Sequence, residues 1–179
     1  MSSLRALRQS VHSSRDDEDR VMDIYSYIKA DHRKVAKLID DILAINLSQV
    51  RQQLFSDLRT ELTLHAEAEE ATFYTAIVEM TQSHQLSLKM DHAEHEHNEM
   101  RDLMQVLIDT PLSSAFWMEK FGELKSVIEH HVREEEDEVF PQAQVLISPG
   151  DAKALARDMA RLKAEMRQEM AAHQGELQF

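Results

Sequence analysis

The sequence contains no cysteine, and it has only three glycines and three prolines. Without cysteine the chain cannot form disulfides, thiolate zinc sites, iron–sulfur clusters or a cysteine nucleophile. The scarcity of glycine and proline, and the absence of Asn-Gly and Asp-Gly pairs, argue against a fold built from β-hairpins. Alanine, leucine, methionine, glutamate, lysine, arginine and glutamine dominate instead, and this composition predicts an all-α protein.

The sequence also lacks an apolar run long enough to cross a membrane, and its N-terminus has no apolar segment of the secretory type. No basic stripe suited to nucleic acid is present, and the formal net charge of the chain is −13. We therefore expect a cytoplasmic protein that binds neither membranes nor nucleic acid. Residues 1–20 predict a polar, disordered tail, with a transit peptide as the alternative because they are rich in arginine and serine.

The helical period of the apolar residues predicts five helices. The first runs from residue 21 to about Ala44–Leu47, where Asn46 can cap it, and the next three span about 48–80, 84–108 and 113–145. Pro141 should kink the fourth helix. Four long helices with short loops predict an antiparallel up-down four-helix bundle over residues 21–147.

A fifth, C-terminal helix is predicted over residues 151–172. Its apolar stripe should pack on the bundle or on a second copy of the chain, because an amphipathic face needs a partner. The stripe consists of Leu155, Met159, Leu162, Met166 and Met170.

Residues 65–74, HAEAEEATFY, place a histidine four residues ahead of a glutamate, and such residues share one face of a helix. With 33 acidic residues in 179, roughly two of the ten histidines should have an acid at i+4 by chance. Six do: His12, His65, His92, His95, His130 and His131. The simplest explanation of one such pair is a solvated charge pair, so the rest of the chain must decide.

An internal repeat separates the alternatives. The segment HAEAEEATFYT at 65–75 matches HVREEEDEVFP at 131–141, and DHRKVAKLI at 31–39 matches EHNEMRDLM at 96–104. His32 precedes His65 by 33 residues, and His97 precedes His131 by 34. Each of two helical hairpins therefore carries one histidine on its first helix and His-xxx-Glu on its second.

The repeated histidines lie on helix faces that must also bury apolar residues, as His32 does between Ile28 and Val35. A buried imidazole needs a partner, which is either a nearby carboxylate in the core or a metal. A solvated charge pair has no reason to recur with a second histidine at matched spacing. The repeat favours four imidazoles and two carboxylates converging inside the bundle, a set suited to two borderline divalent metals such as iron, manganese or zinc.

The motifs resemble those of the hemerythrin-like, or HHE cation-binding, family. They are His on the first helix, HxxxE with a following aromatic on the second, Glu-His on the third and HHxxxEE…FP on the fourth, and they cover residues 21–145. The resemblance implies a non-haem di-iron centre with two bridging carboxylates and an oxo or hydroxo bridge, manganese or zinc being alternatives. The implied ligands are His32, His65, Glu69, His97, His131 and Glu135. A ferritin-like site would need Glu-x-x-His, but Leu62 and Ile128 occupy those glutamate positions.

The chain departs from the oxygen-carrying members of that family at one position. Those proteins have a further histidine one turn before the third-helix ligand, where this chain has Ala93. His92 and His95 are turned well off the His97 face, since a helix rotates about 100° per residue. We expect these two and His130 on the surface; a register that uses His95 is the alternative, but it would break the matched spacing.

Nearby acids are open to two interpretations, as hydrogen-bond partners of the ligands or as a solvated face. We leave both open for Glu70 and Glu94, and we assign Glu134 and Glu136 to the solvated face. Glu94, one turn before His97, is a candidate substitute ligand.

Three functions are compatible with this site. The first is a di-iron protein that binds, senses or reacts with O2, peroxide or NO, as an oxidoreductase if it turns over. The second is an iron-binding module for storage, donation or iron-centre repair, although the repair proteins that this chain resembles usually carry a cysteine-containing N-terminal segment. The third, a structural bundle with adventitious metal, is disfavoured by the repeat. We expect a monomer or homodimer.

Overall fold

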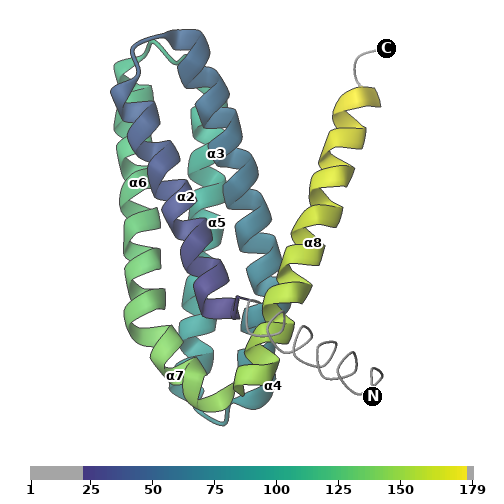
Figure 1. Ribbon diagram of the computed structural model, residues 1–179. Helices are drawn as coiled ribbons and strands as arrows, with labels where there is room; N and C mark the ends of the chain where they lie inside the picture. The colour runs from purple at the N-terminus through teal and green to yellow at the C-terminus, as the bar shows by residue number, and fades with distance from the viewer. Residues whose placement is uncertain (1–21, 177–179) are drawn as a thin grey trace, which may run out of the picture.

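The computed structural model describes residues 22–176, which form helices joined by short loops (Figure 1). The bundle consists of α2 (Ile24–Ala44), α3 (Ser48–Glu69), α5 (His84–Asp109) and α6 (Ala115–Glu134), with the short helices α4 (Thr75–Met80) and α7 (Phe140–Leu146) at one end. Helix α8 (Pro149–Glu176) follows. The predicted all-α, antiparallel four-helix bundle with an additional C-terminal helix is confirmed. The predicted tail, residues 1–20, lies outside the described residues.

Side chains before the helices fix where three of them begin. Asp23 accepts a hydrogen bond from the backbone N–H of Ser26 at 2.8 Å, and Ser83 and Ser114 cap α5 and α6 in the same way. The first helix ends at Ala44, with Ile45 rather than Asn46 as its C-terminal cap.

Two π-helical segments interrupt helices that the sequence predicts as continuous. They are η1 (Glu70–Tyr74) between α3 and α4, and η2 (Glu135–Val139) between α6 and α7. A π turn adds one residue to the local repeat, so it re-aims the side chains that follow and is frequent at functional sites. Two consecutive residues are buried where each segment ends. They are Phe73 and Tyr74 in η1, and Val139 of η2 with Phe140, the first residue of α7. Pro141, predicted to kink this helix, lies in the first turn of α7, directly after η2.

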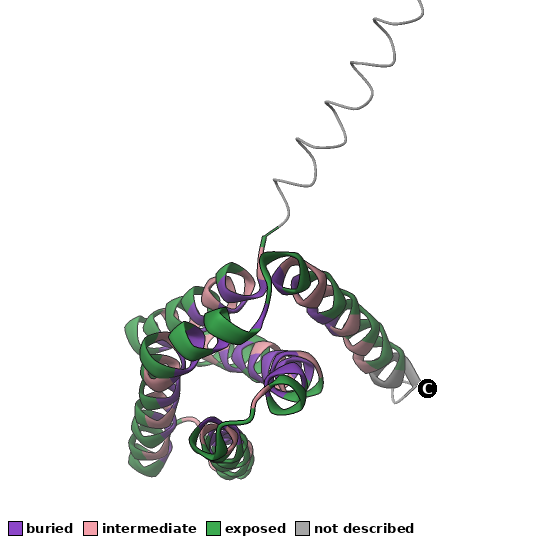
Figure 2. Ribbon diagram, turned by 90° about the horizontal axis from the view of Figure 1, so that it is seen from below, coloured by how far each residue is buried: buried purple, intermediate pink, exposed green. Residues whose placement is uncertain are grey.

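The apolar core is divided into two clusters along the bundle. One cluster, at the end near α4 and α7, includes Ile24, Ile28, Phe73 and Phe140. The other includes Val35, Leu58, Trp117 and Phe121, and the Trp117 indole donates a hydrogen bond to the carbonyl of Leu107 at 3.2 Å. Buried residues line the inner faces of the helices (Figure 2). The segments between the two clusters carry the predicted histidines, which places a polar layer inside an apolar interior.

Helix α8 packs on the bundle against α2, α3 and η1. Its buried face is formed by Ala152, Ala156, Met159 and Lys163, with Leu155 and Leu162 half-buried. Beyond this contact the helix diverges from the bundle (Figures 1 and 2). Met166 and Met170, at the far end of the predicted stripe, line a groove shared with α3 residues such as Arg59 and Thr63.

Among residues 22–176, no helix is both long and apolar enough to span a bilayer.

Candidate metal centre

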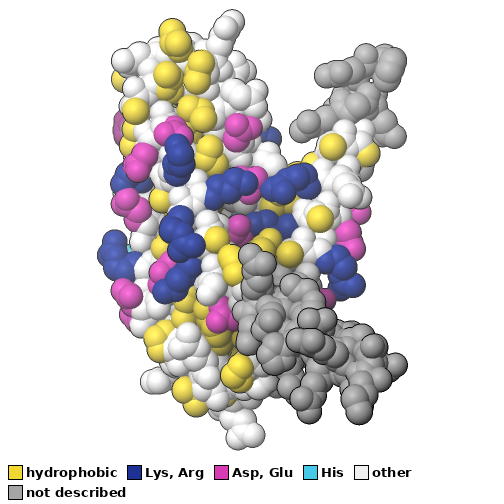
Figure 3. Space-filling model, viewed as in Figure 1, with side chains coloured by type: hydrophobic (Ala, Val, Ile, Leu, Met, Phe, Trp, Pro, Cys, Tyr) yellow, Lys and Arg dark blue, Asp and Glu magenta, His cyan; other side chains and the backbone are white. Residues whose placement is uncertain are grey.

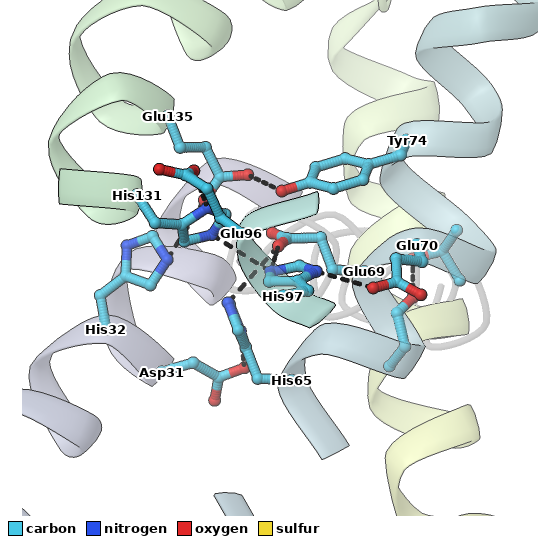
Figure 4. A network of polar contacts seen from close by, with 12 residues as sticks. Asp31, His32, His65, Glu69, Glu70, Tyr74, Glu96, His97, His131 and Glu135 are labelled. Carbon is cyan, nitrogen blue, oxygen red and sulfur yellow. Dashed lines mark hydrogen bonds and ion pairs between the residues drawn. The ribbon is translucent and has the colours of Figure 1, made fainter. Parts of the chain in front are cut away.

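The structure brings the six predicted ligand residues together in the interior of the bundle (Figure 4). All six side chains are buried, and none exposes more than 6% of its surface. Two groups each have one donor atom per residue within 4.8 Å of the others: His32, His65, His131 and Glu135, and His65, Glu69, His97 and His131. The two sets adjoin, as a pair of neighbouring metal ions would require, and each histidine that belongs to both sets has one Nε2 lone pair, which it can give to only one ion.

The Nε2 atoms of the four histidines face one another and the two glutamates. His32 Nε2 lies 3.2 Å from Glu135 Oε2, and His65 Nε2 lies 3.4 Å from Glu69 Oε2. His97 Nε2 lies 3.2 Å from His131 Nε2.

The opposite ring nitrogen of every histidine, Nδ1, faces a carboxylate from a different element. The pairs are His32 with Glu136 at 2.8 Å, His65 with Asp31 at 3.5 Å, His97 with Glu70 at 2.8 Å and His131 with Glu96 at 3.1 Å. These four carboxylates follow the internal repeat as well, since Asp31 and Glu96 are 65 residues apart and Glu70 and Glu136 are 66 apart. The pseudo-twofold symmetry therefore includes the partners of the ligands.

Each of these outer carboxylates is held by a second donor. Asp31 pairs with Lys163 Nζ at 2.6 Å, Glu70 with Arg101 at 2.9 Å, Glu96 with His130 at 2.7 Å and Glu136 with Lys29 at 3.2 Å. Burial opposes ionisation of all four, but the histidine that each carboxylate faces holds its pKa below the usual range. An ionised carboxylate can only accept, so Nδ1 of His32, His97 and His131 carries the proton, and Nδ1 of His65 points at Asp31 in the same way. In the neutral imidazole each Nε2 then presents its lone pair inward.

Several inward-facing atoms are buried without a hydrogen-bond partner in the described part of the chain. They are the Nε2 atoms of His32 and His65, both carboxylate oxygens of Glu69, and Oε2 of Glu135. Buried polar atoms are normally satisfied, and the facing lone pairs of His97 and His131 would repel each other. Cations bound among these atoms would satisfy all of them, so the residues present fit a metal centre.

The two glutamates differ in their electrostatic surroundings. Burial raises the pKa of Glu69 well above its usual range, and the charge of Glu135 raises it further. Burial acts in the same direction on Glu135, but its close contact with His32, together with the charges that His131 and His32 carry when protonated, lowers its pKa to about 2. Neighbouring buried carboxylates resist double ionisation, and a divalent ion would allow both to be charged.

Tyr74, in η1, breaks the twofold symmetry of the centre. Its hydroxyl lies 3.3 Å from Glu135 Oε1, and its ring stacks on His97 with centroids 5.8 Å apart. Burial and the charge of Glu135 raise the pKa of Tyr74 well above its usual range, so the phenol keeps its proton and donates. The equivalent residue of the second repeat, Phe140, has no hydroxyl.

A cavity of about 620 Å³ between α2 and α6 reaches the edge of the centre. His32, Ile39, Ile128 and Glu136 are among its lining residues. Small molecules therefore have a route to the His32 side of the polar layer.

Other sequence predictions about this region had mixed outcomes. His92, His95 and His130 are exposed, as predicted. Glu94 is also exposed, whereas Ala93 faces the core. The assignment of Glu136 to the solvated face is wrong, because its carboxylate bonds to the buried His32. Glu134 is half-exposed and faces His92 and His130 rather than the four buried histidines.

Sequence reasoning missed the roles of Asp31, Glu96 and Tyr74. A signal existed for the first two, because an acid immediately precedes the histidine in both copies of the repeat.

A four-helix bundle that buries four histidines and two glutamates between apolar clusters is typical of metal-binding helical proteins. The chain belongs to the hemerythrin HHE cation-binding domain family, which matches residues 23–143.

Two known proteins are similar to most of the chain. The crystal structure of a hemerythrin HHE cation-binding domain-containing protein from Mycobacterium kansasii has a TM-score of 0.71 and 26% identity, covering 83% of this chain and 89% of that one. A DNA nickase from Nostoc sp. (strain PCC 7120 / SAG 25.82 / UTEX 2576) is 26% identical over 165 residues, which are 92% of this chain and 45% of the nickase. The chain thus spans less than half the length of that relative.

Proposed function

We propose that this protein is a non-haem di-iron protein that binds, senses or reacts with O2, peroxide or NO. The observation that carries the proposal is the pair of adjoining donor groups, in which four inward-facing imidazoles and two carboxylates lie inside an apolar core. Mixed nitrogen and oxygen donors suit iron, with manganese or zinc as alternatives. The proposed ligands are His32, His65, Glu69, His97, His131 and Glu135.

A pair of iron ions at this position would supply the electrons that reduce a small oxidant. The protein contributes the surroundings of that chemistry. Asp31, Glu70, Glu96 and Glu136 fix the orientation and tautomer of the histidines, and Tyr74 donates a hydrogen bond to Glu135. The two apolar clusters keep bulk water out, while the cavity beside His32 admits a small ligand.

Ala93 favours reaction over reversible oxygen storage. It is buried on the core face of α5, one turn before His97, where the oxygen carriers that this chain resembles have a further histidine. Glu94, the other candidate ligand of this turn, is exposed. With no ligand from this turn, exogenous molecules have more access to the metals, which supports oxidation on contact with O2.

Iron analysis of purified variants tests the ligand assignment. His65→Ala and His131→Ala should retain little of the iron found in the unaltered protein, expected at about two ions per chain. His95→Ala is the matched control, since His95 is an exposed histidine of the same His-xxx-acid pattern, and it should keep its iron. Full iron content in the first two variants would refute the assignment.

Rapid mixing tests the function. The reduced, iron-loaded protein is mixed with O2, peroxide or NO while its visible absorption is followed. Fast oxidation that vacuum does not reverse would support the proposal, whereas recovery of the reduced spectrum under vacuum would indicate an oxygen store. If peroxide is consumed in many turnovers without loss of iron, the centre is an oxidoreductase. Stoichiometric reaction with release of iron would favour the iron-binding module instead.

The activity named for the Nostoc relative is not part of this proposal. The net charge of −13 opposes binding to phosphate backbones. On the face formed by α2 and α8, lysine and arginine side chains are interspersed with acidic ones (Figure 3).

A further inference from the structure

We propose that His92, Glu96, His130 and Glu134 form a second divalent-metal site, suited to zinc, on the outside of α5 and α6. These residues make up two of the six His-xxx-acid pairs in the sequence, and none of the four is a proposed ligand of the buried centre, although Glu96 also contacts His131. One pair comes from each helix, and one donor atom per residue lies within 4.8 Å of the others.

The distances within this outer site approach those of a bound zinc ion. His92 Nε2 lies 3.8 Å from Glu96 Oε1 and 3.6 Å from Glu134 Oε2, and His130 Nε2 lies 3.9 Å from Glu134 Oε1. Tetrahedral zinc with bonds of about 2.0–2.1 Å separates its ligand atoms by about 3.3–3.4 Å. The side chains of His92 and His130 are 51% exposed, so small rotations can close the remaining gap.

Glu96 gives the outer site one ligand whose position is fixed by the core. Its side chain is only 7% exposed, and its two oxygens have different partners. Oε2 faces His131 Nδ1 at 3.1 Å, while Oε1 faces His130 Nδ1 at 2.7 Å. Because one oxygen is anchored in the core, the other presents a pre-positioned ligand to the surface.

The other side of the site is open to solvent. A surface cavity of about 240 Å³ is lined by His130, Arg133, Glu134, Asp137 and Glu138. Three acids against one arginine leave an excess of negative charge, although Glu138 is itself paired with Lys89 at 2.6 Å. The cavity gives room for a water ligand and for exchange of the ion with solution.

A third pair of the same sequence pattern supplies an internal comparison. His95 and Glu99 are also on α5 and both are exposed, but no second helix adds a pair to them among the described residues. If the pattern alone bound zinc, this pair would bind it as well. If the two-helix arrangement is required, only the outer site will.

The shared carboxylate links the outer site to the buried centre. Zinc on Glu96 Oε1 would draw charge from the carboxylate and weaken the hydrogen bond that its other oxygen accepts from His131. Zinc binding outside should therefore change the visible absorption of the iron centre without removing iron.

Calorimetric titration of the iron-loaded protein with Zn2+ tests the proposal, with iron measured before and after. We expect one added zinc per chain and unchanged iron. His92→Ala and His130→Ala should each weaken zinc binding by more than about tenfold, while His95→Ala should bind like the unaltered protein. A fourth variant, Glu134→Gln, should also weaken zinc binding. Because Glu134 is half-exposed, this change keeps the test independent of folding defects.

Three outcomes would overturn the proposal. They are no zinc uptake by the unaltered protein, zinc binding by the His92 and His130 variants as tight as that of the unaltered protein, and zinc uptake matched by loss of iron. The last would place the added zinc in the buried centre. Failure here would leave the iron analysis of the His65 and His131 variants unaffected, so the two proposals are tested separately.

Discussion

Lys163 of α8 and Asp31 of α2 form a buried ion pair, with Lys163 Nζ 2.6 Å from Asp31 Oδ2. Both side chains are largely buried, at 6% and 15% exposure. Asp31 in turn faces Nδ1 of His65 at 3.5 Å, so a chain of polar contacts runs from the C-terminal helix to a proposed metal ligand. The C-terminal helix therefore contributes to the centre as well as to the core.

Replacing Lys163 should weaken the metal centre. In Lys163→Met the side chain keeps its bulk, but Asp31 loses its cationic partner and holds the His65 ring less firmly. We expect iron affinity to fall by about 10–100-fold, the usual effect of disturbing a partner of a metal ligand. Competition with a chelator measures this affinity. Arg161→Ala, on the exposed face of α8, is the control, and equal affinity in the two variants would contradict the role of Lys163.

Glu69 should destabilise the protein when no metal is bound. Both of its carboxylate oxygens are buried without a hydrogen-bond partner, and burial raises its pKa. Glu69→Gln removes the cost of ionisation at neutral pH, so the chelated variant should unfold at a higher denaturant concentration. The expected gain is on the order of 1–3 kcal/mol. The same variant should bind little iron.

This prediction separates stability from function at one position. A loss of stability in chelated Glu69→Gln would show that the carboxylate is satisfied in the metal-free protein. Glu67→Gln, two residues away on the exposed side of α3, should change neither property.

The sequence was sufficient to place the helices and to bring the six candidate ligands together. Apolar periodicity defines the inner face of each helix, and residues such as His32 lie on that face among Ile28 and Val35. The matched spacing of the repeat then brings both hairpins to the same level of the bundle. That these residues bind metal stays a prediction.

The π segments could not be predicted from the sequence. Residues 70–74 and 135–139 have the composition of ordinary helix, and the wider turns coincide with the burial of consecutive residues in the core, Phe73 with Tyr74 and Val139 with Phe140. Glu136 was misassigned for a related reason, because a run of acids resembles a solvated face until the neighbouring helix is placed beside it. The buried face of α8 relies on Ala152 and Ala156, whose small side chains allow close approach and give little apolar signal.

His65 should make the stability of the chelated protein depend on pH. Burial lowers the pKa of His65 from 6.5 to about 4 in the folded protein, with a further contribution from the charge of His32. Between these pH values the unfolded chain binds a proton at this position and the folded protein does not. The contribution of His65 to the free energy of unfolding is therefore fully present above pH 6.5, and it is lost as the pH decreases from 6.5 to 4.

The contribution of His65 is measured as a difference between two proteins. Denaturant titrations of chelated His65→Asn and of the unaltered protein are compared across this range. The difference in unfolding free energy should change by at most about 3 kcal/mol, since one pKa unit corresponds to about 1.4 kcal/mol. Parallel curves would show that the pKa of His65 is the same in the folded and unfolded protein, which would contradict the prediction.

Tyr74 should influence the reactivity of the centre more than its iron content. Its hydroxyl donates to Glu135 Oε1 at 3.3 Å, and in Tyr74→Phe that oxygen loses this donor while the ring still stacks on His97. A glutamate without the hydrogen bond is a stronger electron donor to a bound metal, so the visible spectrum and the rate of reaction with peroxide should both change. We expect a rate change of about tenfold or more with iron content preserved.

Tyr25→Phe is the matched control, because the Tyr25 hydroxyl is buried in the neighbouring apolar cluster without a hydrogen-bond partner in the described residues. If both variants react with peroxide like the unaltered protein, Tyr74 is only a packing residue; a change confined to Tyr74→Phe assigns it to the centre.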